Sequence, residues 1–383
     1  MSQDNFVYIF LNLFLLLIFF IAGHNISKGG KYSLNSILCI IVYSIILGLR
    51  YGRGDDYFHY QEIYLKGYDE ESQIIFLLIN DILKTVGINE YGFFGIYNFI
   101  EMLCGLFFLG QYRKYSQYLF PLFLIATLGL NENTIRQGLG YGFVFLSLSK
   151  IVSIEYFRIT DLGLYKKELI SALLYFFLAY SIHSMCGYIM ILMVVIHFFI
   201  KKPIPLFISI PVLIFSAYYF STWFDFSWLN PVIAQVSGED DLLSSYANNS
   251  DYWFSEEGMN TDLYERKPLI LLGEMLGTIS LFYTGRKMIS KHRIKGFVSF
   301  YNYYVVGSLI LNAFRSLEIL NRIGSSFSLF WFFPLTIVIY YRKELKSNRM
   351  ATIASYMLIW FIYDYFKYIF LRGDNIRFVW DTI

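Results

Sequence analysis

The stretch from Arg50 to Tyr60 gathers more chemically able side chains than any other short part of this sequence. It holds two arginines, two aspartates, a histidine and three tyrosines, and it directly follows the apolar run Ile37–Leu49. Ionisable side chains beside an apolar membrane helix cost free energy unless they face a water-filled cavity or an oppositely charged partner. We therefore treat this stretch as a functional-site hypothesis.

The arginines point to recognition of an anion. Arg50 and Arg53 are three residues apart, so on a helix they would share a face. A planar guanidinium fork suits phosphate better than a lysine does. A structural alternative is that both snorkel to lipid headgroups and pair with Asp55 or Asp56.

Further arginines follow polar turns later in the chain. Arg136 lies one turn inside an apolar helix, where a cation costs about 2.5–3.5 kcal/mol on insertion scales. Arg315, Glu318 and Arg322 are spaced by three and four, which leaves one surplus cation on a shared face. The arginines that could bind a phosphate or another anionic group of a substrate are Arg50, Arg53, Arg136, Arg315 and Arg322.

Four side chains near these arginines or in similar polar turns could act as a general base: Asp55, Asp56, His59 and His183. Aspartate has an ordinary pKa of about 4 and histidine one of about 6.5, so either type can accept a proton near neutral pH. The residues alone do not choose between them.

Aromatic rings and carboxylates are the residue types that hold sugars. Tyr57 and Tyr60 suit a stacking platform or a membrane-interface belt, and Trp253 and Glu256 lie in an acidic loop near 222–266. No set of histidines and carboxylates has metal-ligand spacing, so we expect neither a metal nor a cofactor. Cys39, Cys104 and Cys186 lie in apolar runs and are expected to be inert core residues.

Composition predicts an all-α integral membrane protein. The chain is 56% hydrophobic, 21% aromatic and only 16% charged, with a mean hydropathy of +0.49. Its apolar runs are continuous, which excludes a β-barrel. We expect one polytopic transmembrane domain over residues 1–383, with about twelve crossings near 6–23, 32–49, 92–111, 117–131, 134–152, 168–182, 184–200, 203–222, 267–285, 297–314, 321–341 and 351–371.

The segment near 73–87 is apolar but short, and it carries Asn80, Asp81 and Lys84. It is expected to be a re-entrant or interfacial helix. If that segment does not cross the membrane, the loops on one side of the membrane hold more lysines and arginines than the loops on the other side. The lysine-rich loops become cytoplasmic by the positive-inside rule, and the candidate site residues face the other side.

The order of these motifs resembles the EpsG-like branch of bacterial polysaccharide polymerases, which is similar in role to the Wzy O-antigen polymerases. The resemblance is carried by the run from Leu49 to Tyr60, by Thr134-Ile135-Arg136-Gln137, by Ser181-Ile182-His183-Ser184 and by Asn321-Arg322-Ile323. It implies a GT-C-type inverting glycosyltransferase of the bacterial inner membrane whose active site faces the periplasm. Its donor and acceptor would be undecaprenyl-pyrophosphate-linked oligosaccharides, for O-antigen or capsule synthesis. The resemblance then implies that the five candidate arginines bind the donor pyrophosphate and that one of the four candidate bases takes the proton of the acceptor hydroxyl.

The expected partners are these lipid-linked substrates, membrane lipid and a chain-length regulator, with no nucleic acid. Three other classes stay open on the residues alone: a flippase or transporter of lipid-linked oligosaccharide, another lipid-linked glycosyltransferase, and a membrane acyltransferase. A transporter is expected to show internal repeats and interrupted helices in matching halves. An acyltransferase would need a cytoplasmic acyl donor, whereas the candidate residues gather on the other side.

Overall fold

The apolar runs form most of the helices of this computed structural model, which describes residues 3–54, 56–67, 74–154, 162–220, 268–314, 318–346, 348–371 and 376–381. The first half holds α1 (Gln3–Ser27), α2 (Tyr32–Gly48), β1 (Arg50–Tyr51), α3 (Tyr57–Lys66), α4 (Ile74–Thr85), α5 (Gly92–Leu109), η2 (Gly110–Tyr115), α6 (Ser116–Asn133), α7 (Ile135–Ile151), α8 (Leu162–Ile182) and α9 (Ser184–Phe199).

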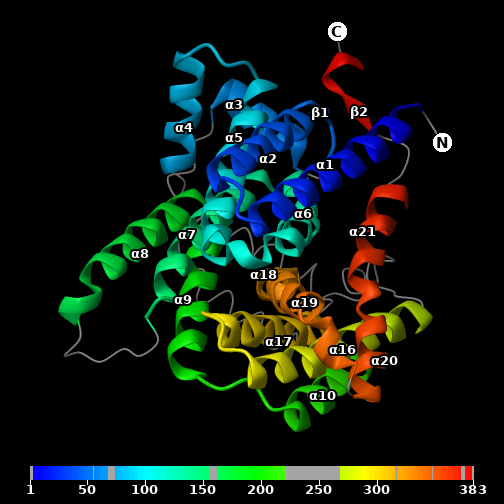
Figure 1. The fold of residues 1–383 in the computed structure, drawn as a ribbon. Coiled ribbons are helices and arrows are strands. Elements are labelled where there is room, and N and C mark those ends of the chain that lie inside the picture. Colours follow the sequence, from blue (N-terminus) through cyan, green and yellow to red (C-terminus); the bar gives the residue numbers. More distant parts are fainter. Residues whose placement is uncertain are drawn as a thin grey trace.

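The second half holds α10 (Leu206–Phe215), η4 (Ser216–Phe220), α16 (Pro268–Lys291), α17 (Phe297–Ala313), α18 (Glu318–Ser328), η6 (Leu329–Trp331), α19 (Phe332–Tyr340), η7 (Arg342–Leu345), α20 (Arg349–Met357), α21 (Ile359–Leu371), β2 (Arg377–Phe378) and η8 (Val379–Asp381). In Figure 1, α1, α2, α5 and α6 form the upper part of the bundle. The helices α10, α16, α17 and α20 form the lower part, and α18 lies between the two.

Four stretches in the described part are long and apolar enough to cross a membrane: Asp4–Ser27, Gly92–Asn133, Pro268–Lys291 and Leu320–Tyr340. Shorter apolar helices cover Tyr32–Gly48, Ser184–Phe199 and Leu206–Tyr218. By its secondary structure and its apolar helices, the chain is thus a helical membrane protein. The expected number of about twelve crossings and the GT-C arrangement remain predictions.

Several elements differ from those that the sequence predicts. The polar helix α3 was not expected, because it has no apolar run; it forms because its rings pack on α5, with Tyr57 stacked on Phe94 at 4.3 Å and Tyr64 on Phe93 at 4.6 Å between centroids. The expected span 321–341, by contrast, agrees with the candidate span Leu320–Tyr340, within which α18, η6 and α19 follow one another without a break. The expected acidic loop near 222–266 lies outside the described residues.

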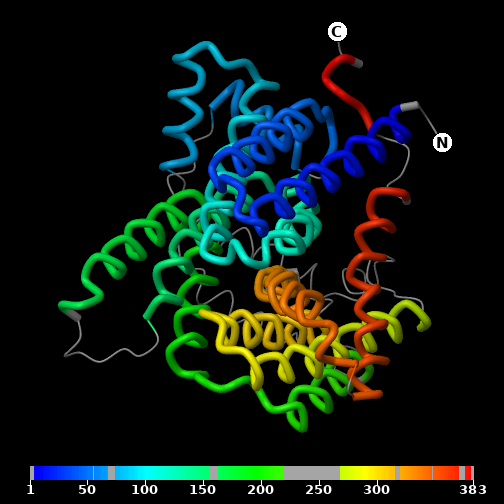
Figure 2. Tube along the Cα trace, in the orientation of Figure 1, coloured from blue at the N-terminus to red at the C-terminus, as the bar shows by residue number. Residues whose placement is uncertain are grey.

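The two ends of the chain meet. Strands β1 and β2 pair antiparallel, with Arg50 opposite Phe378, and the Tyr365 hydroxyl of α21 donates to the Asn12 carbonyl of α1 at 3.3 Å. Figure 2 shows the blue N-terminal helix and the red C-terminal segment at the same corner of the molecule. The C-terminal strand therefore closes over the Arg50–Tyr60 stretch.

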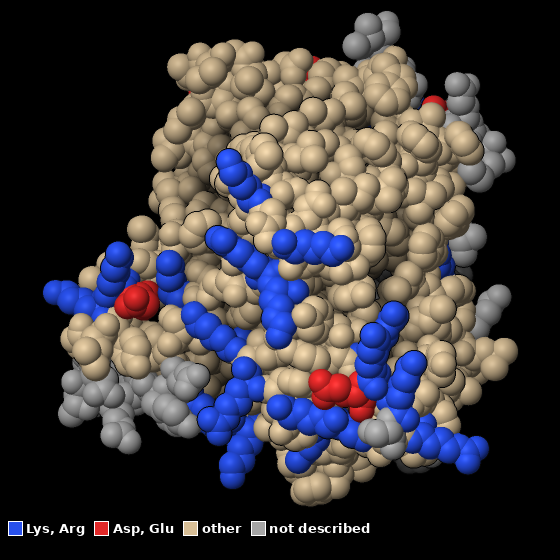
Figure 3. All heavy atoms as spheres, viewed as in Figure 1, with Lys and Arg blue, Asp and Glu red and all other residues tan. Residues whose placement is uncertain are grey.

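Basic side chains gather on one face of the molecule, where acidic side chains appear at only a few places (Figure 3). Among the described residues, most of the exposed lysines and arginines come from the loops that the positive-inside rule makes cytoplasmic. They are Lys28, Lys31, Arg113, Lys114, Lys166, Lys167, Lys201, Lys202, Lys291, Arg293, Lys295, Arg342, Lys343, Lys346 and Arg349.

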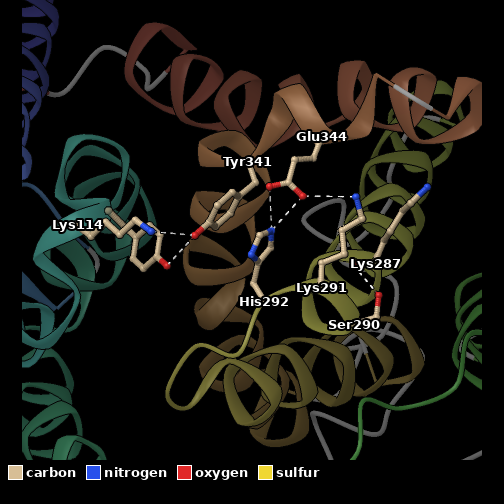
Figure 4. Close-up of polar contacts among 8 residues, drawn as sticks. Lys114, Lys287, Ser290, Lys291, His292, Tyr341 and Glu344 are labelled. Atoms are coloured by element: carbon tan, nitrogen blue, oxygen red, sulfur yellow. Dashed lines mark hydrogen bonds and ion pairs between the residues drawn. The ribbon is translucent and has the colours of Figure 1, made fainter.

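Part of this basic surface ties the two halves of the bundle together (Figure 4). Glu344 of η7 lies 3.2 Å from Nε2 of His292 and 3.4 Å from Nζ of Lys291, and the His292 ring stacks on Tyr341 at 3.7 Å. Lys114 of η2 donates to the Tyr341 hydroxyl at 3.1 Å. These contacts are structural and exposed, and none of them belongs to the predicted site.

The Arg50–Arg53 segment is buried against the break between α6 and α7. Nη1 of Arg50 donates to the Asn131 carbonyl at 2.7 Å, and Nη1 of Arg53 lies 3.7 Å from Oε1 of Glu132. The two arginines are only 1% and 3% exposed. Desolvation by burial lowers the pKa of Arg50 to about 10, while the charge of Glu132 acts in the opposite direction.

Two tyrosines complete this buried network. Tyr8 of α1 and Tyr368 of α21 both donate to Oε2 of Glu132, at 3.0 and 2.8 Å, and the Arg53 guanidinium lies over the rings of Tyr8 and Phe378. A buried ion pair is stable only where further hydrogen bonds satisfy its remaining atoms. We call Arg50, Arg53, Asn131, Glu132, Tyr8 and Tyr368 the Glu132 network.

This close packing predicts that Gly54 cannot be replaced by a residue with a side chain without loss of stability. Its φ is +102°, and an added Cβ would lie 1.9 Å from the Glu132 carbonyl oxygen. We expect Gly54→Ala to lower the unfolding free energy by about 3 kcal/mol or more, from backbone strain and the clash together. Thermal unfolding of the purified protein in detergent measures this.

Gly67→Ala is the matched control, because Gly67 also has a positive φ of +79° but no atom of the described residues lies within 4 Å of the added Cβ. It should cost only the backbone strain. Equal unfolding temperatures for the two variants would contradict the close packing of Gly54 against α6.

Removal of one partner of the buried ion pair should also be costly. We expect Arg53→Met to destabilise the protein by about 3–5 kcal/mol, because Glu132 keeps a buried charge without its guanidinium partner. The control is Lys66→Met, which breaks the exposed Lys66–Glu62 pair and should leave the unfolding temperature unchanged. Similar behaviour of both variants would show that the Arg53–Glu132 pair does not hold the α6–α7 break.

Candidate active site

Arg136 owes its position to the break between α6 and α7. Thr134 leaves the helical conformation with φ −128° and ψ 70°, and the chain becomes helical again at Ile135. Arg136 therefore lies in the first turn of α7. Its guanidinium carbon is 6.0 Å from the centroid of the Tyr60 ring and 5.8 Å from that of Phe76, so α3 and α4 cover one side of it.

His183 occupies a similar break between α8 and α9. It is the N-cap residue of α9, with extended backbone angles of φ −153° and ψ 110°. Gly140 lies one turn after Arg136, where an added Cβ would be 2.7 Å from Sγ of Cys186 and 3.6 Å from Cβ of His183. The missing side chain at Gly140 thus lets the start of α9 approach α7 on the face that carries Arg136.

Arg322 of α18 acts electrostatically on the same residues, His183 and Tyr60. Burial, together with the smaller effect of the charges of Arg136 and Arg322, lowers the pKa of His183 to about 3. Burial raises the pKa of Tyr60 to about 12; Arg136 and Arg322 oppose this rise, and Asp56 adds to it. We call Arg136, Arg322, His183, Tyr60 and Asp56 the arginine cluster.

The structure divides the predicted site residues between different surroundings. Arg136, Arg322, His183, Tyr60 and Asp56 come together in the arginine cluster, whereas Arg50 and Arg53 belong to the buried Glu132 network. His59 is exposed on α3, and Tyr57 is 1% exposed with its ring covered by Phe94. The remaining predicted residues, Asp55, Arg315, Trp253 and Glu256, lie outside the described residues.

Other predictions about packing can be checked directly. Cys39, Cys104 and Cys186 are buried and unpaired, which confirms them as core residues. Gly138 and Gly142 face α5, where added Cβ atoms would lie 3.0 Å from Oε2 of Glu101 and 3.2 Å from Cβ of Cys104. The absence of side chains at these two positions, four residues apart, lets α7 pack closely on α5.

Sequence reasoning missed the role of Glu132. The only sequence signal is an acid that ends an apolar helix, and such an acid has many possible partners. Its tyrosine donors, Tyr8 and Tyr368, are separated from it by 124 and 236 residues. No local pattern could have joined them.

The arginine cluster has the chemistry of an anion site. Two guanidinium groups supply forked donors for phosphate oxygens, and the first turns of α7 and α9 bring the positive ends of two helices to the same place. Low local dielectric strengthens such contacts when charge develops on a leaving group. The neutral imidazole of His183 beside them can accept a proton.

Comparisons with known proteins agree with this membrane architecture. The family model for the EpsG family matches residues 34–379, which is nearly the whole chain. No curated protein and no solved structure matches. The chain accordingly belongs to the EpsG family, a family of membrane proteins of the polysaccharide-polymerase type.

Proposed function

We propose that this protein polymerises a bacterial surface polysaccharide, O-antigen or capsule, from oligosaccharides carried on undecaprenyl pyrophosphate. The growing glycan is transferred from its lipid carrier to the non-reducing end of another lipid-linked repeat unit, with inversion, on the periplasmic side of the inner membrane. A chain-length regulator is a further proposed partner. The observation that carries the proposal is the convergence of Arg136, Arg322 and an uncharged His183 from three separate helices.

Each residue of the arginine cluster has a proposed role. The acceptor hydroxyl attacks the anomeric carbon of the donor sugar while the bond from that carbon to the pyrophosphate oxygen breaks. Arg136 and Arg322 stabilise the charge that builds on this leaving oxygen. His183 takes the hydroxyl proton, and Asp56 or Asp55 orients the acceptor. Undecaprenyl pyrophosphate leaves as the second product.

The low pKa of His183 has a specific consequence in this mechanism. Without substrate, the two arginine charges disfavour the imidazolium, so His183 is ready to accept a proton but is a weak base. A bound pyrophosphate offsets those charges and raises the basicity of His183. The base thus becomes effective only when the donor is in place.

An apolar groove on the same helices suits the polyprenyl tail of the donor. It has a volume of about 910 Å³ between α7, α8 and α9, and it runs from Met190 to Lys201 along α9. Met190 is two turns from His183, roughly 10 Å along the helix axis. A lipid whose pyrophosphate lies on Arg136 and Arg322 can therefore place its tail in this groove.

The distribution of charge supports the proposed sidedness. Most of the exposed basic residues in the described part of the chain are from the predicted cytoplasmic loops, while Arg136 and Arg322 are half-buried. Lys201 ends the apolar groove at the basic face, whereas His183 begins α9 at the other end. This arrangement fits an active site that opens on the side away from the cytoplasm.

The test is complementation of a gene deletion in the native host, followed by gel electrophoresis of the surface glycolipid. Wild type should restore the ladder of long chains, and Arg136→Ala or Arg322→Ala should leave a band of core plus one repeat unit. Loss of one such charge-stabilising donor is expected to slow transfer by about 100-fold or more. Arg293→Ala, on the basic face, is the control and should restore the ladder.

Three outcomes would contradict the proposal. Normal ladders from both Arg136→Ala and Arg322→Ala at limiting donor would remove the pyrophosphate assignment. A full ladder of shifted mobility in the deletion strain would indicate a glycan-modifying enzyme. Loss of even the single-repeat band would indicate export or an earlier step.

The pKa of His183 should depend on the donor. In nanodiscs, ¹⁵N NMR of labelled histidine should show His183 unprotonated through pH 4–6, with His183→Gln used to assign its signal. Undecaprenyl pyrophosphate should raise this pKa by more than about one unit, since it offsets nearby positive charge. Arg322→Gln should raise it without ligand. If neither undecaprenyl pyrophosphate nor Arg322→Gln changes the pKa of His183, then His183 does not belong to the arginine cluster.

A further inference from the structure

Two cavities beside α21 differ in chemistry from the rest of the bundle. One, of about 190 Å³, lies between α16, α17, α18 and α21, and the other, of about 230 Å³, lies between α6, η6 and α21. Both are lined by Trp331, Phe361 and Asp364, so they adjoin each other. We call the combined space the α21 cleft.

The lining combines hydrogen-bonding groups with aromatic faces. Glu274 and Asp364 supply carboxylates, and Thr278, Ser308, Asn312 and Ser328 supply hydroxyls and an amide. Trp331, Trp360 and Phe361 supply rings. By contrast, the larger groove between α7, α8 and α9 is almost wholly apolar. A polar cleft is therefore not a general property of this helix bundle.

Ionisable groups within apolar helices need a reason, because ionisable residues in membrane helices usually face a functional cavity. Asp364 is exposed within the apolar helix α21, and the indole N–H of Trp360 is shielded from solvent with no hydrogen-bond acceptor among the described residues. An indole N–H can only donate, so it requires an acceptor such as a ligand hydroxyl or water.

The helices are built to hold Trp360 at this place. Added Cβ atoms at Gly273 and Gly277 of α16 would lie 2.5 and 3.1 Å from Trp360 atoms. The small-xxx-small pair of α16 thus forms a seat for this ring. Replacement of either glycine would push the indole out of the cleft.

The cleft is unsuited to phosphate. No lysine or arginine is among the described residues that line it, and its two carboxylates would repel a pyrophosphate. Neutral hydroxyl-rich rings are the ligands that carboxylates, amides and aromatic faces hold together. We infer that the α21 cleft binds a sugar residue of the lipid-linked glycan, which rests on the proposed function for the identity of that glycan.

The cleft shares the helix α18 with the arginine cluster and the residue Tyr368 with the Glu132 network. Ser328 lies less than two turns from Arg322 on α18 but on a different face, so this helix separates the cleft from the arginine cluster. On the other side, Tyr368 lines the cleft and donates to Glu132, the partner of Arg53. A glycan in the cleft therefore lies next to the proposed pyrophosphate site without sharing its cations.

The experiment measures binding of oligosaccharides released from the host polymer by partial hydrolysis. Full-length protein in nanodiscs is titrated while saturation-transfer NMR and tryptophan fluorescence are recorded. Asp364→Asn and Trp360→Phe should each raise the Kd about tenfold, since each removes one strong hydrogen bond to the sugar. Asp81→Asn and Trp380→Phe are matched controls at exposed positions outside the cleft and should bind as wild type does.

Asp364→Asn keeps the shape of the side chain, so it tests binding even if Trp360→Phe unfolds, and unfolding temperatures identify that case. Absence of saturable binding by wild type, or equal binding by Asp364→Asn and its control, would overturn the proposal that the cleft binds a sugar. Binding of undecaprenyl pyrophosphate is measured in the same samples. Sugar binding without Arg136-dependent lipid binding would refute the pyrophosphate site alone, and the reverse would refute the cleft alone.

Discussion

The buried ion pair between Arg53 and Glu132 is the constraint on which the rest of the structure depends. Two charges removed from water lose several kcal/mol each in hydration, and their attraction restores this only with good geometry and further hydrogen bonds. Tyr8 and Tyr368 provide those hydrogen bonds from the first and last long helices. The pair thus joins both ends of the chain to the α6–α7 break. That break sets the direction of Arg136, so a structural interaction positions the proposed catalytic one.

The predicted site arginines therefore fall into two groups, one structural and one proposed to bind the substrate. Spacing alone suggested that Arg50 and Arg53 share a helical face with access to substrate. In the structure, they lie in a strand and turn shaped by Gly52 and Gly54, both with positive φ, and their side chains contact protein groups. Sequence could not reveal this division, because Asn131, Glu132 and Phe378 come from distant segments. It did predict that Arg136, Arg322 and His183 belong together, although their motifs are far apart.

The same reasoning explains which parts of the fold were predictable. Long apolar runs specify helices through hydrophobicity, so α1, α2, α5–α7, α9, α16 and α17 lie close to their expected bounds. The polar helix α3 depends on aromatic packing against α5, and β1 depends on a strand more than 300 residues later. Both are products of tertiary contact. The cleft beside α21 could not be predicted for a similar reason, since its lining residues come from α6, α16, α17, α18, η6 and α21, which are spread widely along the sequence.

Charge separates the two proposed binding regions. The arginine cluster carries two guanidinium groups, which suit the proposed pyrophosphate, whereas the α21 cleft carries two carboxylates and no lysine or arginine among its described lining residues. A lipid-linked glycan has the same asymmetry, with an anionic pyrophosphate at one end and neutral sugars beyond it. Bound in reverse, it would place phosphates against carboxylates and leave the arginines without an anion, which costs several kcal/mol for each misplaced charge. The charge pattern of the protein can thus orient the substrate before any individual sugar is recognised.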